Sequence, residues 1–146
     1  MSEPRRPRPA PSNARDDWET PPEIFDALDA EFHFTLDVCA RSGNAKCSAF
    51  ISPEEDGLVQ WWGGTCWMNP PYGRAIGKWV AKAHAEAQAG AVVVGFLPAS
   101  TDTRWFHDHI YGIAEIRFIR GRVRFVGAPY NAPFPSMIVV WRPCDV

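Results

Sequence analysis

The sequence predicts an α/β domain whose mixed, mostly parallel sheet has helices on both faces and an antiparallel C-terminal end. Apolar, strand-like segments alternate with segments of helical spacing through the first two thirds of the chain. Residues 91–97 form an uninterrupted apolar run after a helical segment, which is typical of a central parallel strand buried on both faces. The last third contains β-rich segments joined by loops with Gly and Pro, which indicates antiparallel strands.

Length and composition indicate one domain preceded by a short tail. The 146 residues are enough for one core, and we expect a single domain over residues 16–146. Residues 1–15 are basic, rich in proline and poor in large apolar side chains, so they are predicted to be disordered. Such a tail either contacts phosphate groups or is only a solubilising leader, and the sequence favours neither. Its arginines are Arg5, Arg6, Arg8 and Arg15.

Charge and cysteine usage narrow the class of protein. The formal net charge is −2, so no overall positive field indicates a nucleic-acid partner. The chain has no apolar run like that of a signal peptide and nothing near the ~20 apolar residues of a membrane span, so we expect a cytoplasmic protein. No metal site is predicted, because the cysteines form no Cys-x-x-Cys pair and His107 and His109 would lie on different faces of a helix. The cysteines are Cys39, Cys47, Cys66 and Cys144.

The first predicted helix begins at a capping box, residues 20–23. Thr20 is the expected N-cap, proline takes the first helical position and Glu23 the third, and the helix is predicted over residues 21–30. A strand is predicted at residues 32–36, leading into Asp37. A second short strand is predicted at residues 48–51, before an acidic loop.

The remaining elements follow from periodicity and from Gly and Pro positions. A strand is predicted at residues 65–68, and a helix follows from Arg74 until Gly90 stops it. After the apolar strand, a helix is predicted at residues 101–111. Strands are then predicted at residues 115–119, 123–126 and 137–141, with a strand-turn-strand at residues 120–122.

Polar residues follow several predicted strands. Asp37, the acidic loop of residues 53–57, residues 69–72 and residues 98–102 each come directly after a strand. Because ligands of such sheets bind beyond the carboxyl ends of the strands, these segments are predicted to converge on one edge.

The segment Asn69-Pro70-Pro71-Tyr72 lies at a predicted strand-to-helix turn. The two prolines fix the backbone and lack N–H donors, so carbonyl acceptors remain beside the Asn69 amide. Acceptors at Asn69 and Pro70 would hold the exocyclic amine of a planar base for methyl transfer, and Tyr72 would stack on the base. A base in a duplex would first have to be flipped out. The alternative is a turn that is merely rigid.

Seven ordered motifs between Trp18 and Trp141 resemble those of the small phage-type DNA N-6-adenine methyltransferases. They are residues 18–21 (WETP), 36–40 (LDVCA), 44–47 (NAKC), 55–58 (EDGL), 69–72 (NPPY), 101–106 (TDTRWF) and 132–136 (APFPS). The resemblance implies a Rossmann-like methyltransferase fold, S-adenosylmethionine as cofactor, and transfer to N6 of a flipped-out adenine in DNA. It also implies a phage or prophage protein in a bacterial host.

The resemblance also implies roles for individual residues. The predicted catalytic residues are Asn69, Pro70, Pro71 and Tyr72, and the predicted cofactor-binding residues are Trp18, Thr20, Pro21, Asp37, Cys39, Ala40, Asn44, Asp56 and Asn69. Two alternatives stay open: Thr20 serves only as a helix cap, and Asp56 is only a solvated loop acid. The first motif departs from the glycine-rich form of such enzymes, since Gly43 is the only glycine in its loop.

The predicted DNA-binding residues are arginines. Arg120, Arg122 and Arg124 alternate and would share one face of an extended strand, where guanidinium groups suit phosphates. Arg104, from the motif at residues 101–106, joins this set. The alternative is a solvent-facing edge strand protected from aggregation by its charge.

Two other functions compete with DNA adenine methylation. One is methylation of another planar amine, in RNA guanine or protein glutamine, because the same turn occurs in those enzymes. The other is a catalytically silent DNA-binding module. Neither the recognition sequence nor the oligomeric state is predicted.

Overall fold

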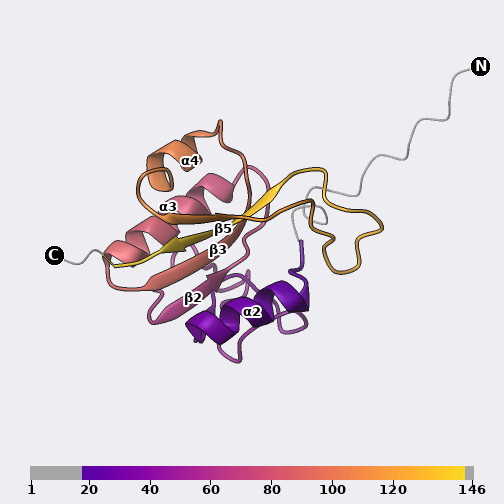
Figure 1. The fold of residues 1–146 in the computed structure, drawn as a ribbon. Helices are drawn as coiled ribbons and strands as arrows, with labels where there is room; N and C mark the ends of the chain where they lie inside the picture. Colours follow the sequence, from indigo (N-terminus) through magenta and orange to yellow (C-terminus); the bar gives the residue numbers. More distant parts are fainter. Residues whose placement is uncertain (1–17, 144–146) are drawn as a thin grey trace, which may run out of the picture.

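The computed structural model describes residues 18–143 and contains one five-stranded sheet within them (Figure 1). The tail predicted at residues 1–15 and Cys144 lie outside the described residues. The strands are β1 (Leu36–Asp37), β2 (Thr65–Met68), β3 (Val92–Pro98), β4 (Glu115–Phe118) and β5 (Ser136–Trp141). Their order is β1-β2-β3-β5-β4, with β1 to β3 parallel and β5 antiparallel to both neighbours. The mixed α/β prediction and the antiparallel C-terminal end are therefore confirmed.

The centre of the sheet is a β2–α3–β3 unit. Helix α3 (Ile76–Gln88) buries Val80 and Ala83, and β3 is buried over most of its length. Gly95 in β3 pairs with Met68 in β2. A Cβ at Gly95 would lie 3.1 Å from the side chains of Met68 and Trp141, so the large neighbours occupy the space that glycine leaves. The predicted strand at residues 65–68 and the central strand are both confirmed.

Helix α2 (Pro22–Phe32) begins later than predicted and has no side-chain cap. Its N-cap is Pro21, so the capping-box prediction for Thr20 is wrong. The reason is tertiary, because the Thr20 hydroxyl instead contacts the side chain of Asn69, 49 residues away. Helix α2 packs through aromatic side chains: Phe25 lies 5.3 Å from Trp67 of β2, measured between ring centroids.

Helix α4 (Arg104–His109) is shorter than the predicted helix at residues 101–111. Thr103 is its N-cap, and its hydroxyl accepts from the backbone N–H of Phe106 at 3.3 Å. The indole of Trp141 in β5 donates to the carbonyl of His109 at 2.8 Å, which attaches α4 to the sheet. No helix within residues 18–143 is long and apolar enough to cross a membrane.

Three predicted strands are wrong in whole or in part. Phe32 ends α2, so the strand predicted at residues 32–36 is reduced to β1, and Phe50 makes only an isolated bridge with Asp37. Residues 123–126 form no strand. Instead of turning back on β4, the segment 119–135 runs to the N-terminal segment, where Val126 N–H donates to the Glu19 carbonyl at 3.1 Å. Figure 1 shows this long segment projecting beyond the sheet on its right-hand side.

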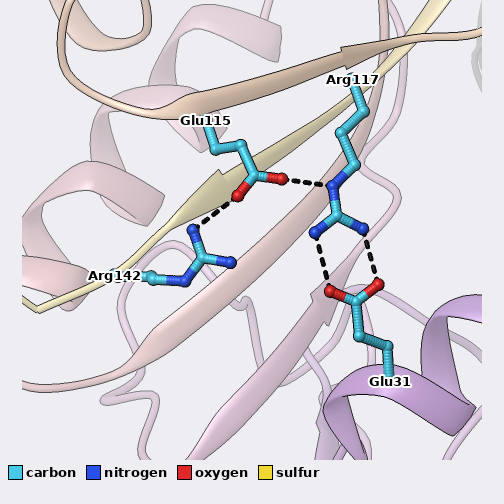
Figure 2. Close-up of polar contacts among 4 residues, drawn as sticks. All are labelled: Glu31, Glu115, Arg117 and Arg142. Atoms are coloured by element: carbon cyan, nitrogen blue, oxygen red, sulfur yellow. Dashed lines mark hydrogen bonds and ion pairs between the residues drawn. The ribbon is translucent and has the colours of Figure 1, made fainter.

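An ion-pair network joins α2 to β4 and the end of β5 (Figure 2). The Arg117 guanidinium donates to both carboxylate oxygens of Glu31 at 2.7 Å and also contacts Glu115. Arg142 donates to Glu115 at 2.9 Å. Hydrogen bonds from Arg117 lower the pKa of both carboxyl groups. Phe32 lies beneath the Arg117 and Arg142 guanidinium groups, so the network also covers an apolar ring.

Replacing Gly57 by alanine should destabilise the protein by about 1–3 kcal/mol, because the loop packs too closely for a side chain. A Cβ there would collide with the Val38 carbonyl and lie 2.8 Å from the Trp79 ring. Gly43→Ala is the matched control, because a Cβ at Gly43 meets nothing within 4 Å. Denaturant unfolding of both variants measures the difference. Equal unfolding free energies for Gly57→Ala and wild type would show that the loop packs less tightly than described.

Candidate active site at the carboxyl edge of the sheet

Most of the predicted cofactor-binding residues meet in a small recess. Asp37 ends β1 and Asn69 directly follows β2, and parallel strands bring their carboxyl ends to the same edge. The segment before α2 closes the recess from the other side. Its lining residues are Trp18, Glu19, Thr20, Asp37, Cys39, Asn44, Lys46, Trp67 and Asn69.

The Asn69 amide is held in one orientation. Its Nδ2 donates to the Trp18 carbonyl and, at 3.0 Å, to the Thr20 hydroxyl. Because a carbonyl can only accept, the NH₂ group must face Trp18 and the Oδ1 atom must face away. Asn69 Oδ1 is buried and has no hydrogen-bond partner within residues 18–143. The site therefore presents a fixed acceptor that lacks a donor.

Asp37 is a buried carboxylate, with 2% of its surface exposed. Its two oxygens accept from the backbone N–H groups of Cys39 at 3.2 Å and Lys46 at 3.0 Å. Burial nevertheless raises the pKa of Asp37 to about 6. The Lys46 ammonium lies 3.7 Å from the Glu19 carboxylate at the mouth of the same recess. This end of the site is charged and polar.

A second recess adjoins the first. Cys39 lines both, and the second is lined mainly by apolar residues. Asp56 lies at its rim in a left-handed conformation (φ 58°), and its carboxylate accepts from Leu58 N–H at 3.0 Å. The lining residues are Val38, Cys39, Ile51, Ser52, Pro53, Asp56, Gly57, Pro71 and Trp79. Together, the two recesses suit an elongated ligand with one charged end and one flat apolar end.

Two predicted cofactor-binding residues line neither recess. Ala40 is buried, and its N–H donates to the Ile51 carbonyl at 3.1 Å. Pro21 is buried as the N-cap of α2.

Tyr72, which the sequence predicts to stack on the base, is buried. It is 8% exposed, its hydroxyl donates to the Phe96 carbonyl at 2.7 Å, and burial raises its pKa. Its ring packs edge-on against Phe125 and Phe134 at 6.1 and 5.6 Å. Trp18 packs against the same two phenylalanines at 5.1 and 5.6 Å. These four rings, Trp18, Tyr72, Phe125 and Phe134, form an aromatic cluster beside Asn69.

The predicted DNA-binding arginines are all exposed, although not as a strand. Arg122 and Arg124 alternate with buried Val123 and Phe125, so the expected exposure pattern is kept in an irregular segment. Arg124 Nε donates to the Ala128 carbonyl at 3.1 Å. Arg120 lies at the start of this segment, whereas Arg104 begins α4.

The sequence did not single out several residues of the site. Glu19, Lys46 and Trp67 line the first recess, and Phe125 and Phe134 belong to the aromatic cluster. Glu19, Lys46 and Phe134 all stand inside motifs of the resemblance, so membership of a motif was the available signal. In the sequence, Trp67 and Phe125 cannot be distinguished from ordinary residues of the hydrophobic core.

Comparison with known proteins decides the family. The model of the family described as DNA N-6-adenine-methyltransferase (Dam) matches residues 9–145. The chain belongs to this family.

Named relatives are similar to shares of the chain that differ in length. The DNA N-6-adenine-methyltransferase of Haemophilus phage HP1 (strain HP1c1) is 32% identical over 139 residues, covering 88% of this chain and 80% of that protein. The DNA N-6-adenine-methyltransferase of Escherichia phage T1 is 35% identical over 112 residues, covering 75% of this chain. The putative methyltransferase YfdM of Escherichia coli (strain K12) is 35% identical over 65 residues, covering 39% of this chain and 71% of that protein. The chain spans about half of the phage T1 relative, 47% of its length.

Asp37 should make the protein less stable as the pH rises. Its folded-state pKa of about 6 lies above its ordinary value of 3.8, so the folded state favours the protonated form. The stabilisation is complete below about pH 4 and is lost through about pH 6, a change on the order of 3 kcal/mol. Asp37→Asn should flatten the pH dependence of the unfolding free energy in this range, measured by urea unfolding.

The exposed variant Asp26→Asn is the matched control for loss of one negative charge. If the pH profile of Asp37→Asn ran parallel to that of wild type from pH 4.5 to 7.5, burial of Asp37 would not govern its titration.

Proposed function

We propose that the protein transfers a methyl group from S-adenosylmethionine to N6 of a flipped-out adenine in DNA. The observation that carries this proposal is the buried, unpartnered Asn69 Oδ1, fixed by two hydrogen bonds at the carboxyl edge of the sheet. An acceptor held in that way requires a donor, and the amine of a base supplies one. Family membership supports adenine in DNA as the bearer of that amine.

Asn69 and Pro70 would orient the amine. The Asn69 Oδ1 accepts one N–H of N6, and the Pro70 carbonyl accepts the other, which localises the nitrogen lone pair toward the cofactor. The rigid Trp18 and Thr20 contacts keep the Asn69 oxygen from turning away. Pro71, which lines the second recess, fixes the turn between the base and the cofactor.

The polar first recess and the apolar second recess support S-adenosylmethionine as the ligand. The buried Asp37 carboxylate would pair with its ammonium group, and the Lys46 ammonium beside Glu19 suits its carboxylate. The second recess offers an apolar slot for the flat adenine ring, with the Asp56 carboxylate at its rim for a hydroxyl or amine donor. When bound, the cofactor supplies an electrophilic methyl group on a sulfonium. Thr20 acts indirectly, through Asn69.

The target base would enter through the aromatic cluster. Tyr72 and Phe125 now pack against each other, so a base stacked on Tyr72 requires the segment 119–135 to shift outward. Stacking on these rings would offset part of the cost of removing the base from the duplex. The exposed Arg120, Arg122 and Arg124 on the same segment would hold the phosphates nearby, and Arg104 would add a contact from α4.

We infer a Rossmann-like methyltransferase fold with helices on both faces, in one domain over residues 16–146. The alternation of side chains along the strands supports the presence of helices on both faces. Phe96 and Ile138 form a directly opposed pair, as do Val93 and Trp141, so Phe96 and Trp141 lie on opposite faces of the sheet. Trp67 stacks on Phe96 and meets α2, while Trp141 contacts α4.

Wild-type protein should introduce N6-methyladenine into DNA of a host that lacks adenine methylation. Asn69→Ala should reduce turnover about 100-fold or more, since one buried hydrogen-bonding group at a reacting centre has this effect. Cofactor binding should stay within a few-fold. Gln88→Ala, an exposed amide at the end of α3, is the matched control. Modified bases are measured by mass spectrometry of digested DNA.

The outcomes separate the rival functions. Cofactor binding without any modified adenine would indicate a silent DNA-binding module. Methyl label found in RNA or protein alone would indicate another planar amine. Wild-type turnover in Asn69→Ala would refute the assigned role of the amide.

Cofactor affinity should increase as the pH rises from 5 to 7.5, because the ammonium of S-adenosylmethionine pairs with ionised Asp37. With a pKa of about 6 for Asp37, the gain should be about tenfold over this range. Asp37→Asn should bind weakly at every pH, whereas Asn69→Ala should keep the pH dependence. Calorimetric titration at several pH values measures both. A pH-independent wild-type affinity would exclude the Asp37 contact.

A further inference from the structure

Ser136 carries the second unpartnered polar atom of the structure. Within residues 18–143, the buried side-chain nitrogen and oxygen atoms without a hydrogen-bond partner are Asn69 Oδ1 and Ser136 Oγ. Ser136 is 1% exposed, and its backbone carbonyl accepts from Ile119 N–H at 3.1 Å. An unpaired buried hydroxyl destabilises a fold, and alanine would fill nearly the same space without that penalty. The hydroxyl therefore requires an explanation beyond packing.

Ser136 lies at the same edge of the sheet as Asn69. It is the first residue of β5 and pairs with Pro98, the last residue of β3. Because β5 is antiparallel to β3, its beginning lies where the parallel strands end. The unpartnered hydroxyl and the unpartnered amide oxygen are thus both at the edge that holds the recesses.

The two groups also lie on the same face of the sheet. Ser136 shares a face with Ile138, and Ile138 is paired with Phe96. The Phe96 ring stacks on Trp67, which lines the first recess together with Asn69. Asn69 follows Trp67 by two residues, so the alternation of side chains places it on this face.

The spacing of the strands fits a single planar base between the two groups. Asn69 follows β2 and Ser136 begins β5, with β3 between them, so the strands that carry them are about 10 Å apart. The register places Asn69 level with Phe96 and Ser136 level with Pro98, two residues further along β3. A six-membered ring with a hydrogen bond of about 3 Å at each end would bridge the two positions obliquely across β3. Phe96 of β3 lies on this face, and Phe125 packs on it with centroids 5.4 Å apart.

We propose that the Ser136 hydroxyl donates a hydrogen bond to N3 of the target adenine while Asn69 accepts from N6. This inference rests on the proposed function. N3 is para to the carbon that bears N6, so these two polar atoms lie at opposite ends of the six-membered ring. The base takes the place of Phe125 when the segment 119–135 moves outward.

The same contact explains selection of adenine over cytosine. In cytosine the ring atom para to the amine-bearing carbon is N1, which carries the sugar and has no free lone pair. A donor at Ser136 would then stay unpaired, and sites that leave a buried polar group unpaired discriminate strongly. Ser136 is thus a specificity-determining residue that binds the substrate.

The test is a double-substitution cycle on duplex oligonucleotides. The methylated site is first mapped in host DNA, and the target adenine is then replaced by 3-deazaadenine, with 7-deazaadenine as the matched control base. Wild type should lose about tenfold or more in kcat/KM on 3-deazaadenine, and Ser136→Ala should lose as much on adenine. Ser136→Ala should lose nothing further on 3-deazaadenine. The ratio of wild type to variant should be the same for 7-deazaadenine as for adenine.

Thermal stability distinguishes a substrate-binding role of the Ser136 hydroxyl from a purely structural role. Ser136→Ala should melt at or above the wild-type temperature, because it removes an unpaired hydroxyl, and the exposed control Ser48→Ala should match wild type in rate and melting. Wild-type kcat/KM in Ser136→Ala, or losses on adenine and 3-deazaadenine that simply multiply, would overturn the contact. If Ser136→Ala did not fold, equal wild-type rates on adenine and 3-deazaadenine would overturn it. Absence of any wild-type methylation would instead refute the proposed function.

Discussion

The side-chain amide of Asn69 joins two parts of the chain that line the first recess, the segment before α2 and the end of β2. Its NH₂ group is held by the Trp18 carbonyl and the Thr20 hydroxyl, so the chain before α2 is anchored to the end of β2. The segment 119–135 is attached to that same stretch through Val126 and Glu19. The same two hydrogen bonds fix where the free oxygen of the amide points. The far end of α2 is held separately, by the Glu31–Arg117 ion pair (Figure 2).

Asp37 illustrates how a binding site conflicts with stability. Its carboxylate is nearly inaccessible to solvent and accepts from the backbone N–H groups of Cys39 and Lys46. Burial still raises its pKa, so the ionised form is disfavoured in the free protein. A cationic ligand group would remove that cost on binding. The unpaired atoms of Asn69 and Ser136 have the same character, because each would be less costly as an apolar group. These three positions lie at one edge of the sheet, where the proposed substrates meet.

The aromatic cluster limits access to this edge. Tyr72 is buried by Phe125 and Phe134, both carried by the segment 119–135, and the exposed arginines lie on that same segment. In the proposed function, the part of the chain that grips DNA is therefore the part that covers the base pocket. This coupling would place the grip on DNA and the opening of the base pocket in one segment, residues 119–135.

The sequence by itself determined the alternation of strands and helices, the buried central strand, the antiparallel end and the convergence of Asp37 and Asn69 on one edge. These features follow from local periodicity and from the direction of parallel strands. The family motifs named most residues of the first recess. Only the tertiary structure decided that Thr20 holds Asn69 rather than capping a helix, and that Tyr72 is buried. Only it placed Ser136 across β3 from Asn69. The physical reason is that donors and acceptors 24 to 51 residues apart in the chain find each other through strand register and side-chain packing, which no local pattern records.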